Sequence, residues 1–153
     1  MSTAGSDVDD AIRTLLLLMP RMVGRAKRLR VPEELHSLAL APRHLSLLAY
    51  LLFDGESSVN ELAQRLEVAP TTVSLMVGEL SRKGVLERRE DPADRRRKLV
   101  SITAERRPAI DGWLGRSAAA WRVALGPLTA AERRTFVETL TAYERHLGGG
   151  DPA

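Results

Sequence analysis

The segment 58–103 carries a fixed order of local signals, and this order constrains the fold more than any other feature of the chain. It opens with Ser58 and Glu61, which fit a capping box because the serine oxygen can accept from an early helical amide while the glutamate reaches back. Apolar residues then recur on one face at helical spacing: Val59, Leu62, Ala63 and Leu66. This pattern predicts a short amphipathic helix.

A second helix is predicted directly after a turn at 67–69. Pro70 suits its first position because proline has a helix-like φ and its missing N–H would have had no partner there. The predicted inward stripe is Val73, Met76, Val77 and Leu80. Arg82 and Lys83 oppose the helix dipole in the last turn, and Gly84 supplies the left-handed residue that ends the helix. The second helix therefore ends at Arg82.

The segments 85–90 and 98–102 favour β-structure and flank the turn-rich sequence Asp91-Pro92-Ala93-Asp94. They predict a two-stranded hairpin after the second helix. Helix, tight turn, helix and hairpin together describe a winged helix-turn-helix. The predicted fold class is therefore mainly α, with a β wing.

Positive charge is concentrated at this hairpin. The segment 81–98 holds eight basic and four acidic residues, so it carries +4, whereas the whole chain carries +3. A basic hairpin taken alone is as well explained by a solvated edge, but two preceding helices favour a surface for DNA phosphates. The candidate DNA-contacting residues are Ser58, Pro70, Thr71, Thr72, Ser74, Leu75, Arg82, Asp94, Arg95, Arg96, Arg97 and Lys98.

Over nearly its whole length the chain resembles the MarR/SlyA group of winged-helix transcription regulators. The wing motif is the most discriminating part of the resemblance. The motifs that carry it are Glu61-Leu62-Ala63, Thr72-Val73-Ser74, Lys83-Gly84-Val85-Leu86 and Asp91-Pro92-Ala93-Asp94-Arg95-Arg96, followed by Leu99-Val100-Ser101-Ile102-Thr103.

The resemblance implies a division of labour on DNA. Arg96 would enter the minor groove, Asp94 would orient the arginines, and the helix 70–82 would lie in the major groove. The physics agrees, because a narrow minor groove attracts arginine and only the major groove admits a helix. Leu75 and Glu79 depart from the family pattern, which often has basic or long polar residues there. Leu75 either touches a thymine methyl group or packs against the first helix of the motif.

The terminal segments are expected to form a homodimer interface, as the resemblance also implies. A helix over 6–30, which Pro20 is expected to kink, presents a wide apolar arc. Thr103 is expected to cap a helix reaching Leu125, in which Pro108 has no evident role. The predicted organisation is dimerisation helices at 6–31 and 104–147, a winged helix-turn-helix domain at 42–103, and flexible tails at 1–5 and 148–153.

Two further helices complete the expected set. Pro42 should open a helix through Phe53 that is apolar almost all round and forms the buried centre of the lobe. Thr129 and Glu132 form a second capping box, which predicts a final helix ending at Leu147. Its apolar stripe comprises Phe136, Leu140, Tyr143 and Leu147.

A small aromatic or phenolic effector is implied by the resemblance, in a crevice between the dimerisation helices and the winged lobe. The candidate pocket residues are Met19, Met22, Arg43, His44 and Trp113, although such residues more often belong to a core. His36, His44 and His146 lack a metal-binding spacing, so no metal or cofactor is expected. Zinc sensing occurs in some relatives, and a site shared by His36, His44 and a carboxylate stays as an alternative.

Composition excludes several classes of function. The chain has no cysteine, which excludes disulfides, thiolate metal sites and thiol-based sensing, and fits a reducing cytoplasm. The apolar run 15–19 is too short for a membrane span or a signal peptide. The common catalytic motifs are absent, so no enzyme is expected. The predicted function is a homodimeric repressor that binds a pseudo-palindromic double-stranded operator. The alternatives are a protein-interaction module or a metal-responsive regulator.

Overall fold

The computed structural model describes residues 3–28 and 31–148, and it divides the chain into two compact units. The first unit is Met1–Leu114 and the second is Gly115–Ala153. Helix α6 (Arg107–Leu125) contributes residues to both units. The first unit contains the predicted winged helix-turn-helix.

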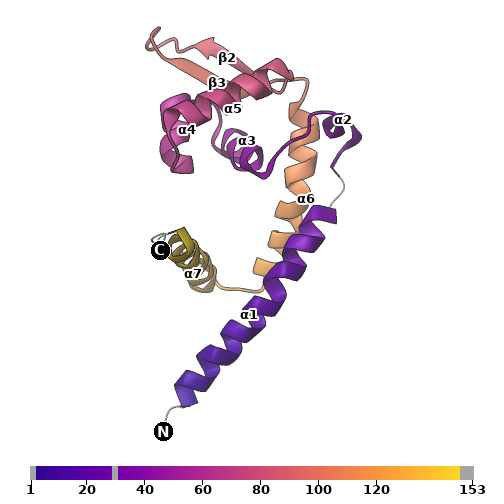
Figure 1. Cartoon of the computed structure of the whole chain (residues 1–153), viewed down its shortest axis with the longest axis vertical. Coiled ribbons are helices and arrows are strands. Elements are labelled where there is room, and N and C mark those ends of the chain that lie inside the picture. Colours follow the sequence, from indigo (N-terminus) through magenta and orange to yellow (C-terminus); the bar gives the residue numbers. More distant parts are fainter. Residues whose placement is uncertain (1–2, 29–30, 149–153) are drawn as a thin grey trace, which may run out of the picture. The chain divides into compact units, whose positions relative to one another are not determined.

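Apart from a short helix at 33–36 and a two-residue strand at 57–58, which were not predicted, the winged lobe follows the predicted order of elements. Its hairpin lies along α5 in Figure 1. The tight turn before α5 is made by Glu67, whose φ of 55° is left-handed. Gly84 follows α5 with a φ of 72°, as its role as helix stop requires. The elements of the lobe are α2 (Glu33–His36), α3 (Pro42–Asp54), β1 (Ser57–Ser58), α4 (Val59–Leu66), α5 (Pro70–Arg82), β2 (Leu86–Glu90) and β3 (Lys98–Ile102).

The sheet has three antiparallel strands in the order β1-β3-β2, one more than the sequence predicted. Strands β2 and β3 pair from Leu86 opposite Ile102 to Glu90 opposite Lys98. Strand β1 is only two residues long and pairs Ser58 with Leu99. Two residues are too few for an alternating pattern, so this strand left no sequence signal.

Helix α3 lies at the centre of the lobe, as its apolar composition predicted. Its side chains Leu47, Leu48 and Leu51 are fully buried. The predicted inward stripe of α5 is buried as well. The other buried apolar residues of this core are Leu35, Leu38, Leu62, Ala63, Val85, Leu86, Val100, Ile102 and Ile110.

Two element boundaries differ from the predictions. Helix α1 (Thr3–Arg28) starts three residues before the expected Ser6 and continues through Pro20. Thr103 does not cap α6, because α6 begins at Arg107 and the Thr103 hydroxyl donates to the carbonyl of Gly84 over 2.8 Å. Pro108 is therefore in the first turn of α6, where its missing N–H is harmless.

Helix α7 (Ala130–Gly148) starts at the predicted capping box in the second unit. The Glu132 carboxylate accepts from the Thr129 N–H over 2.7 Å, and the Thr129 hydroxyl accepts from the Glu132 N–H over 3.2 Å. Trp121 of α6 and Phe136 of α7 make a tilted ring contact, with centroids 5.8 Å apart. Of the expected flexible tails, residues 1–2 and 149–153 lie outside the described residues.

Both units leave apolar side chains exposed on the terminal helices. Helix α7 has no buried residue in the part of the chain that the structure describes. No helix within residues 3–28 and 31–148 is long and apolar enough to cross a membrane. The exposed apolar residues of these helices are Val8, Ile12, Leu15, Leu16, Leu17, Met22, Val23, Trp121, Val123, Val137, Leu140, Tyr143 and Leu147.

Candidate nucleic-acid interface

The tip of the wing is an ordered turn held by its own backbone. The Asp91 N–H donates to the carbonyl of Arg97 over 2.9 Å, and the Arg97 N–H donates to the carbonyl of Asp94 over 2.9 Å. The Asp91 carboxylate also accepts from the N–H of Ala93 over 2.9 Å. These bonds satisfy backbone groups that a loose loop would leave to water. The hairpin therefore presents its side chains from a defined turn.

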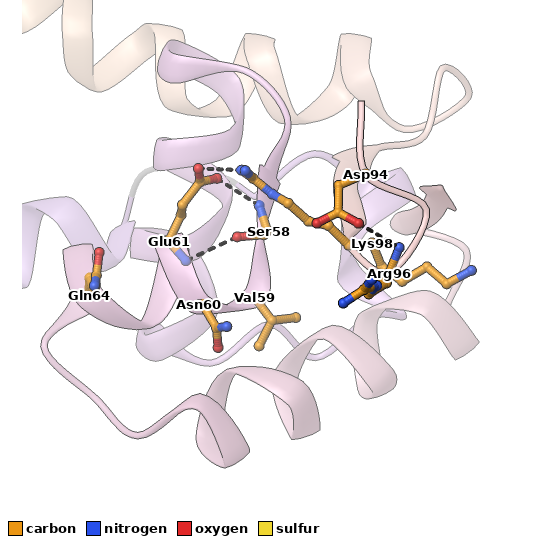
Figure 2. A pocket seen from close by; sticks show the side chains of 9 residues that line it. Ser58, Val59, Asn60, Glu61, Gln64, Asp94, Arg96 and Lys98 are labelled. Carbon is orange, nitrogen blue, oxygen red and sulfur yellow. Dashed lines mark hydrogen bonds and ion pairs between the residues drawn. The ribbon is translucent and has the colours of Figure 1, made fainter. Parts of the chain in front are cut away.

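Asp94 acts on the tip through the main chain. Its Oδ1 accepts from the backbone N–H of Arg96 over 3.0 Å, an interaction marked by a dashed line in Figure 2. This is an Asx-type turn, in which a short carboxylate fixes the backbone two residues on. The resemblance assigned Asp94 to orienting the arginines, and the structure gives it a backbone contact suited to that role.

The arginines at the tip fall into two groups. Arg95 and Arg96 are exposed, and neither makes an ion pair with any residue in the described part of the chain. The Arg97 guanidinium instead pairs with the Glu61 carboxylate of α4, and its Nε lies 3.7 Å from the Oδ2 of Asp91. Only Arg95 and Arg96 offer a free positive charge at the tip.

Lys98 is also paired, because its Nζ lies 3.3 Å from the Oε1 of Glu90 on the neighbouring strand. Both side chains are exposed, so this cross-strand ion pair is weak and screened by salt. Lys98 and Arg97 were both predicted from the sequence to contact DNA. The structure separates them from Arg95 and Arg96, because their charges already have partners.

The Glu61 carboxylate joins the wing to the start of α4. One of its oxygens accepts from the Ser58 N–H over 2.9 Å and the other accepts from the Arg97 guanidinium. The Ser58 hydroxyl in turn accepts from the Glu61 N–H over 3.2 Å, so the predicted capping box is formed (Figure 2). The Ser58 N–H, followed by Arg97, lowers the pKa of Glu61 below its usual value.

A second arginine–carboxylate pair, which was not predicted from the sequence, lies at the base of the wing. The Arg89 guanidinium on β2 makes two hydrogen bonds to the carboxylate of Glu56, which precedes β1. The hydrogen bond from Arg89 lowers the pKa of Glu56. These residues are 33 positions apart, and Glu56 directly precedes strand β1, which was not predicted from the sequence.

The N-terminal half of α5 presents short polar side chains to solvent. Thr71, Thr72 and Ser74 are exposed, and Pro70 begins the helix as predicted. Leu75 is 73% exposed, so it does not pack against α4, and its contact with a thymine methyl group stays a prediction. Arg82 is exposed at the end of the same helix. The exposed face therefore combines hydroxyl groups with one large apolar side chain.

Glu79 is the other unusual residue of α5, and it links this helix to α3. Its Oε2 lies 3.1 Å from Nε2 of His44 and 3.4 Å from the guanidinium of Arg43. Nδ1 of His44 accepts from the Ala41 N–H over 3.0 Å, so Nε2 is the ring nitrogen left to donate. The hydrogen bond from His44 lowers the pKa of Glu79.

These contacts bear on which of the candidate effector residues are accessible to a ligand. His44 is only 2% exposed and both of its ring nitrogens are occupied, so it does not line an open pocket. Trp113 packs against the buried core, Met19 is half-buried, and Met22 is exposed. Within the described residues, no group of three or more histidine, aspartate or glutamate side chains is placed to hold a metal ion.

A surface pocket of about 530 Å³ lies between the wing and the start of α4 (Figure 2). It brings together Glu61 and Arg97, which form the ion pair described above, and several of the predicted DNA-contacting residues. Its lining residues are Ser58, Val59, Asn60, Glu61, Gln64, Asp94, Arg96, Arg97 and Lys98. Helix start and wing tip thus form one continuous polar surface.

Residues 40–97, which contain all the residues of this surface except Lys98, match the sequence model of the MarR family. Over this segment the chain is similar to the MarR family. The matched segment runs from the residues just before α3 to the tip of the wing. The resemblance that the wing motif suggested is therefore confirmed over residues 40–97.

Two curated proteins similar to this chain come from Bacillus subtilis (strain 168). The HTH-type transcriptional repressor MdtR is 38% identical over 77 residues, which cover 48% of this chain and 50% of MdtR. An uncharacterised HTH-type transcriptional regulator, YdgJ, is 25% identical over 71% of this chain and 66% of its own length. The chain thus spans half of the first relative and about two thirds of the second.

Solved structures extend the similarity of fold beyond the winged lobe. The YusO protein of Bacillus subtilis is 25% identical, with a TM-score of 0.55 over 90% of this chain and 96% of YusO. A MarR family protein from Bacillus stearothermophilus has a TM-score of 0.61 over 96% of this chain and 99% of that one, at 17% identity. The predicted fold class, mainly helical with a β wing, is confirmed.

Proposed function

We propose that this protein is a homodimeric transcriptional repressor that binds double-stranded operator DNA. The observation that carries the proposal is the pair of unpaired arginines, Arg95 and Arg96, on an ordered wing beside the exposed polar face of α5. Phosphate contacts supply affinity, whereas contacts with base edges supply specificity. This surface offers side chains for both.

On DNA, α5 enters the major groove and the wing reaches the adjacent minor groove. Arg96 is the minor-groove residue, because it follows the turn that Asp94 holds and its charge has no partner in the described chain. Thr71, Thr72 and Ser74 contact phosphates or base edges through their hydroxyls. Since α5 exposes no arginine before its last turn, recognition relies more on shape and short contacts than on bidentate arginine.

The dimer is formed by the terminal helices α1, α6 and α7. Many apolar side chains of these helices stay exposed in both units, and exposed apolar surfaces of this kind mark association sites. A two-fold dimer sets two winged lobes on half-sites about 34 to 36 Å apart, so the operator is a pseudo-palindrome. The protein acts where DNA lies, in the cytoplasm, by occluding a promoter.

We also propose that a small aromatic or phenolic effector relieves repression. Of the five candidate residues, His44 and Arg43 are engaged by Glu79, so an effector would contact Met19, Met22 or Trp113. Such a ligand must distinguish the DNA-binding state from the other state by its affinity. Screening for release of DNA by phenolic carboxylates tests this part separately.

The proposed function is tested by fluorescence anisotropy with the DNA upstream of the protein's own gene and with a scrambled duplex. We expect tight, salt-dependent binding to a sequence-specific duplex and weak binding to the scrambled one at about 150 mM salt. Because the operator can lie elsewhere, a random-sequence duplex pool is offered in parallel. Failure to enrich any sequence, with no binding at low salt, would contradict the proposal and favour a protein-interaction module.

A further inference from the structure

The wing is fastened to the start of α4 by two carboxylate clamps rather than by the sheet alone. At its base, Arg89 of β2 binds Glu56 through two hydrogen bonds. Near its tip, Arg97 binds Glu61. Between these clamps, β1 contributes only a two-residue strand to the sheet. The clamps therefore add two arginine–carboxylate contacts to the main-chain pairing of β1 with β3.

The clamp at Arg97 is built into the lobe. Its Nε is shielded from solvent and lies 3.7 Å from Asp91, while its terminal nitrogen reaches Glu61. The same Glu61 carboxylate caps α4 through the Ser58 N–H, so this hydrogen bond holds it in place independently of Arg97. A carboxylate held by its own helix is a rigid anchor for a guanidinium. Arg97 is thus tied at both carboxylates, whereas Arg96 beside it is free.

We propose that Arg97 is a positioning residue that holds the wing against α4 and does not itself contact DNA. This inference rests on the proposed function, because its purpose is to aim Arg96. A guanidinium that is neutralised by Glu61 would have to give up that pair to bind a phosphate. It therefore adds little to the release of counterions that drives DNA binding.

Substitutions of these two neighbouring arginines should then have different effects on the salt dependence of DNA binding. Arg96→Gln removes a contact with DNA, so the slope of log K against log salt should become shallower by about 0.9 to 1. Arg97→Gln removes the same charge one residue away. We expect it to weaken binding roughly two- to fivefold at every salt concentration and to leave the slope unchanged.

The measurement is anisotropy over a salt series, with the tightest duplex that the wild-type protein selects from a random-sequence pool. Arg96→Gln is the matched control, because it is the same substitution at an adjacent, unpaired position. A shallower slope for Arg97→Gln, equal to that for Arg96→Gln, would show a phosphate contact and overturn the proposal. Unchanged affinity and slope would overturn it as well.

Hydrogen exchange of the DNA-free protein separates this inference from the proposed function. We expect Arg97→Gln to speed exchange of the Asp91 and Arg97 amides, whose backbone bonds close the wing turn. Glu61→Gln should do the same, because glutamine can still cap α4 but carries no charge. The double variant should exchange no faster than either single variant if the two residues act through one contact.

The exchange experiment stands even if no duplex is bound. Faster exchange confined to the wing would support Arg97 as the wing's anchor, while the failed selection would count against DNA recognition alone. Unchanged exchange in Arg97→Gln would show that the turn does not depend on this clamp, and the inference would fall whether or not the protein binds DNA.

Discussion

Whether a candidate residue is available to contact DNA depends on the side chains beside it, as Arg96, Leu75 and Arg97 show. Both were candidates for DNA contact from sequence, and both are exposed in the structure. Arg97 was a candidate on the same grounds but pairs with Glu61. Sequence reveals the charge of a side chain but not which charge lies beside it, because the partners here are 36 positions apart.

Leu75 makes a prediction about base recognition. If it touches a thymine methyl group, replacing that thymine by deoxyuridine in the selected duplex should weaken wild-type binding by about 0.8 kcal/mol, or roughly fourfold. Leu75→Ala should bind the two duplexes equally. Binding is measured by anisotropy. Val73→Ala is not a suitable control, because Val73 is buried in the core and does not face the DNA. A variant that keeps the wild-type preference would assign the methyl contact elsewhere.

Among the elements, the helices were predicted best where hydrogen bonds at their ends are local. The capping boxes at Ser58 and Thr129 are formed as expected, and α5 spans the predicted residues. The start of α6 was misplaced, because Thr103 satisfies the carbonyl of Gly84 instead of a helix end. Pro108 was the sequence signal for the true start, since proline favours the first helical turn.

The two prolines in long helices are predicted to act in opposite directions. Pro20 lies inside α1 and removes the N–H that would bond the Leu16 carbonyl, so Pro20→Ala should raise the free energy of unfolding, by up to about 3 kcal/mol. Pro108→Ala should lower it slightly, by less than about 1 kcal/mol, because it only loosens the unfolded chain. Urea denaturation at one fixed protein concentration gives both values. Equal effects would mean that the two sites are not distinguished by helix position.

For the whole molecule, association is the main expectation from the exposed terminal helices. Leu140 and Tyr143 lie on α7, a helix without a buried residue in the described chain. Analytical ultracentrifugation should give twice the mass of one chain. Leu140→Glu should shift the protein to monomer, whereas Thr141→Glu adds the same charge at an adjacent position and should not. A wild-type monomer at all concentrations would contradict the dimer.

Acid is predicted to destabilise the folded molecule through its paired carboxylates. The pKa values of Glu56, Glu61, Glu79 and Glu132 are all lowered, chiefly by hydrogen bonds from Arg89, Ser58, His44 and Thr129 respectively. Their stabilisation is present above the unfolded-state pKa and is lost as the pH falls through the lowered folded-state pKa.

Urea denaturation from about pH 6 down to about pH 3 should therefore show stability falling below about pH 4.5. Glu79→Gln should reduce that dependence, because the variant has no charge to lose. Glu144→Gln is the matched control, since Glu144 makes no hydrogen bond in the described chain. The same pH dependence in both variants would show that Glu79 gains nothing from His44 on folding.

The order of helices, the hairpin and the basic wing were readable from spacing, caps and charge, because these signals act within a few residues. Strand β1, the clamps at Glu56 and Glu61, and the burial of His44 were not, because each depends on residues more than 30 positions apart. Local physics specified the long helices and the hairpin, and tertiary packing decided which of their charged side chains remain unpaired.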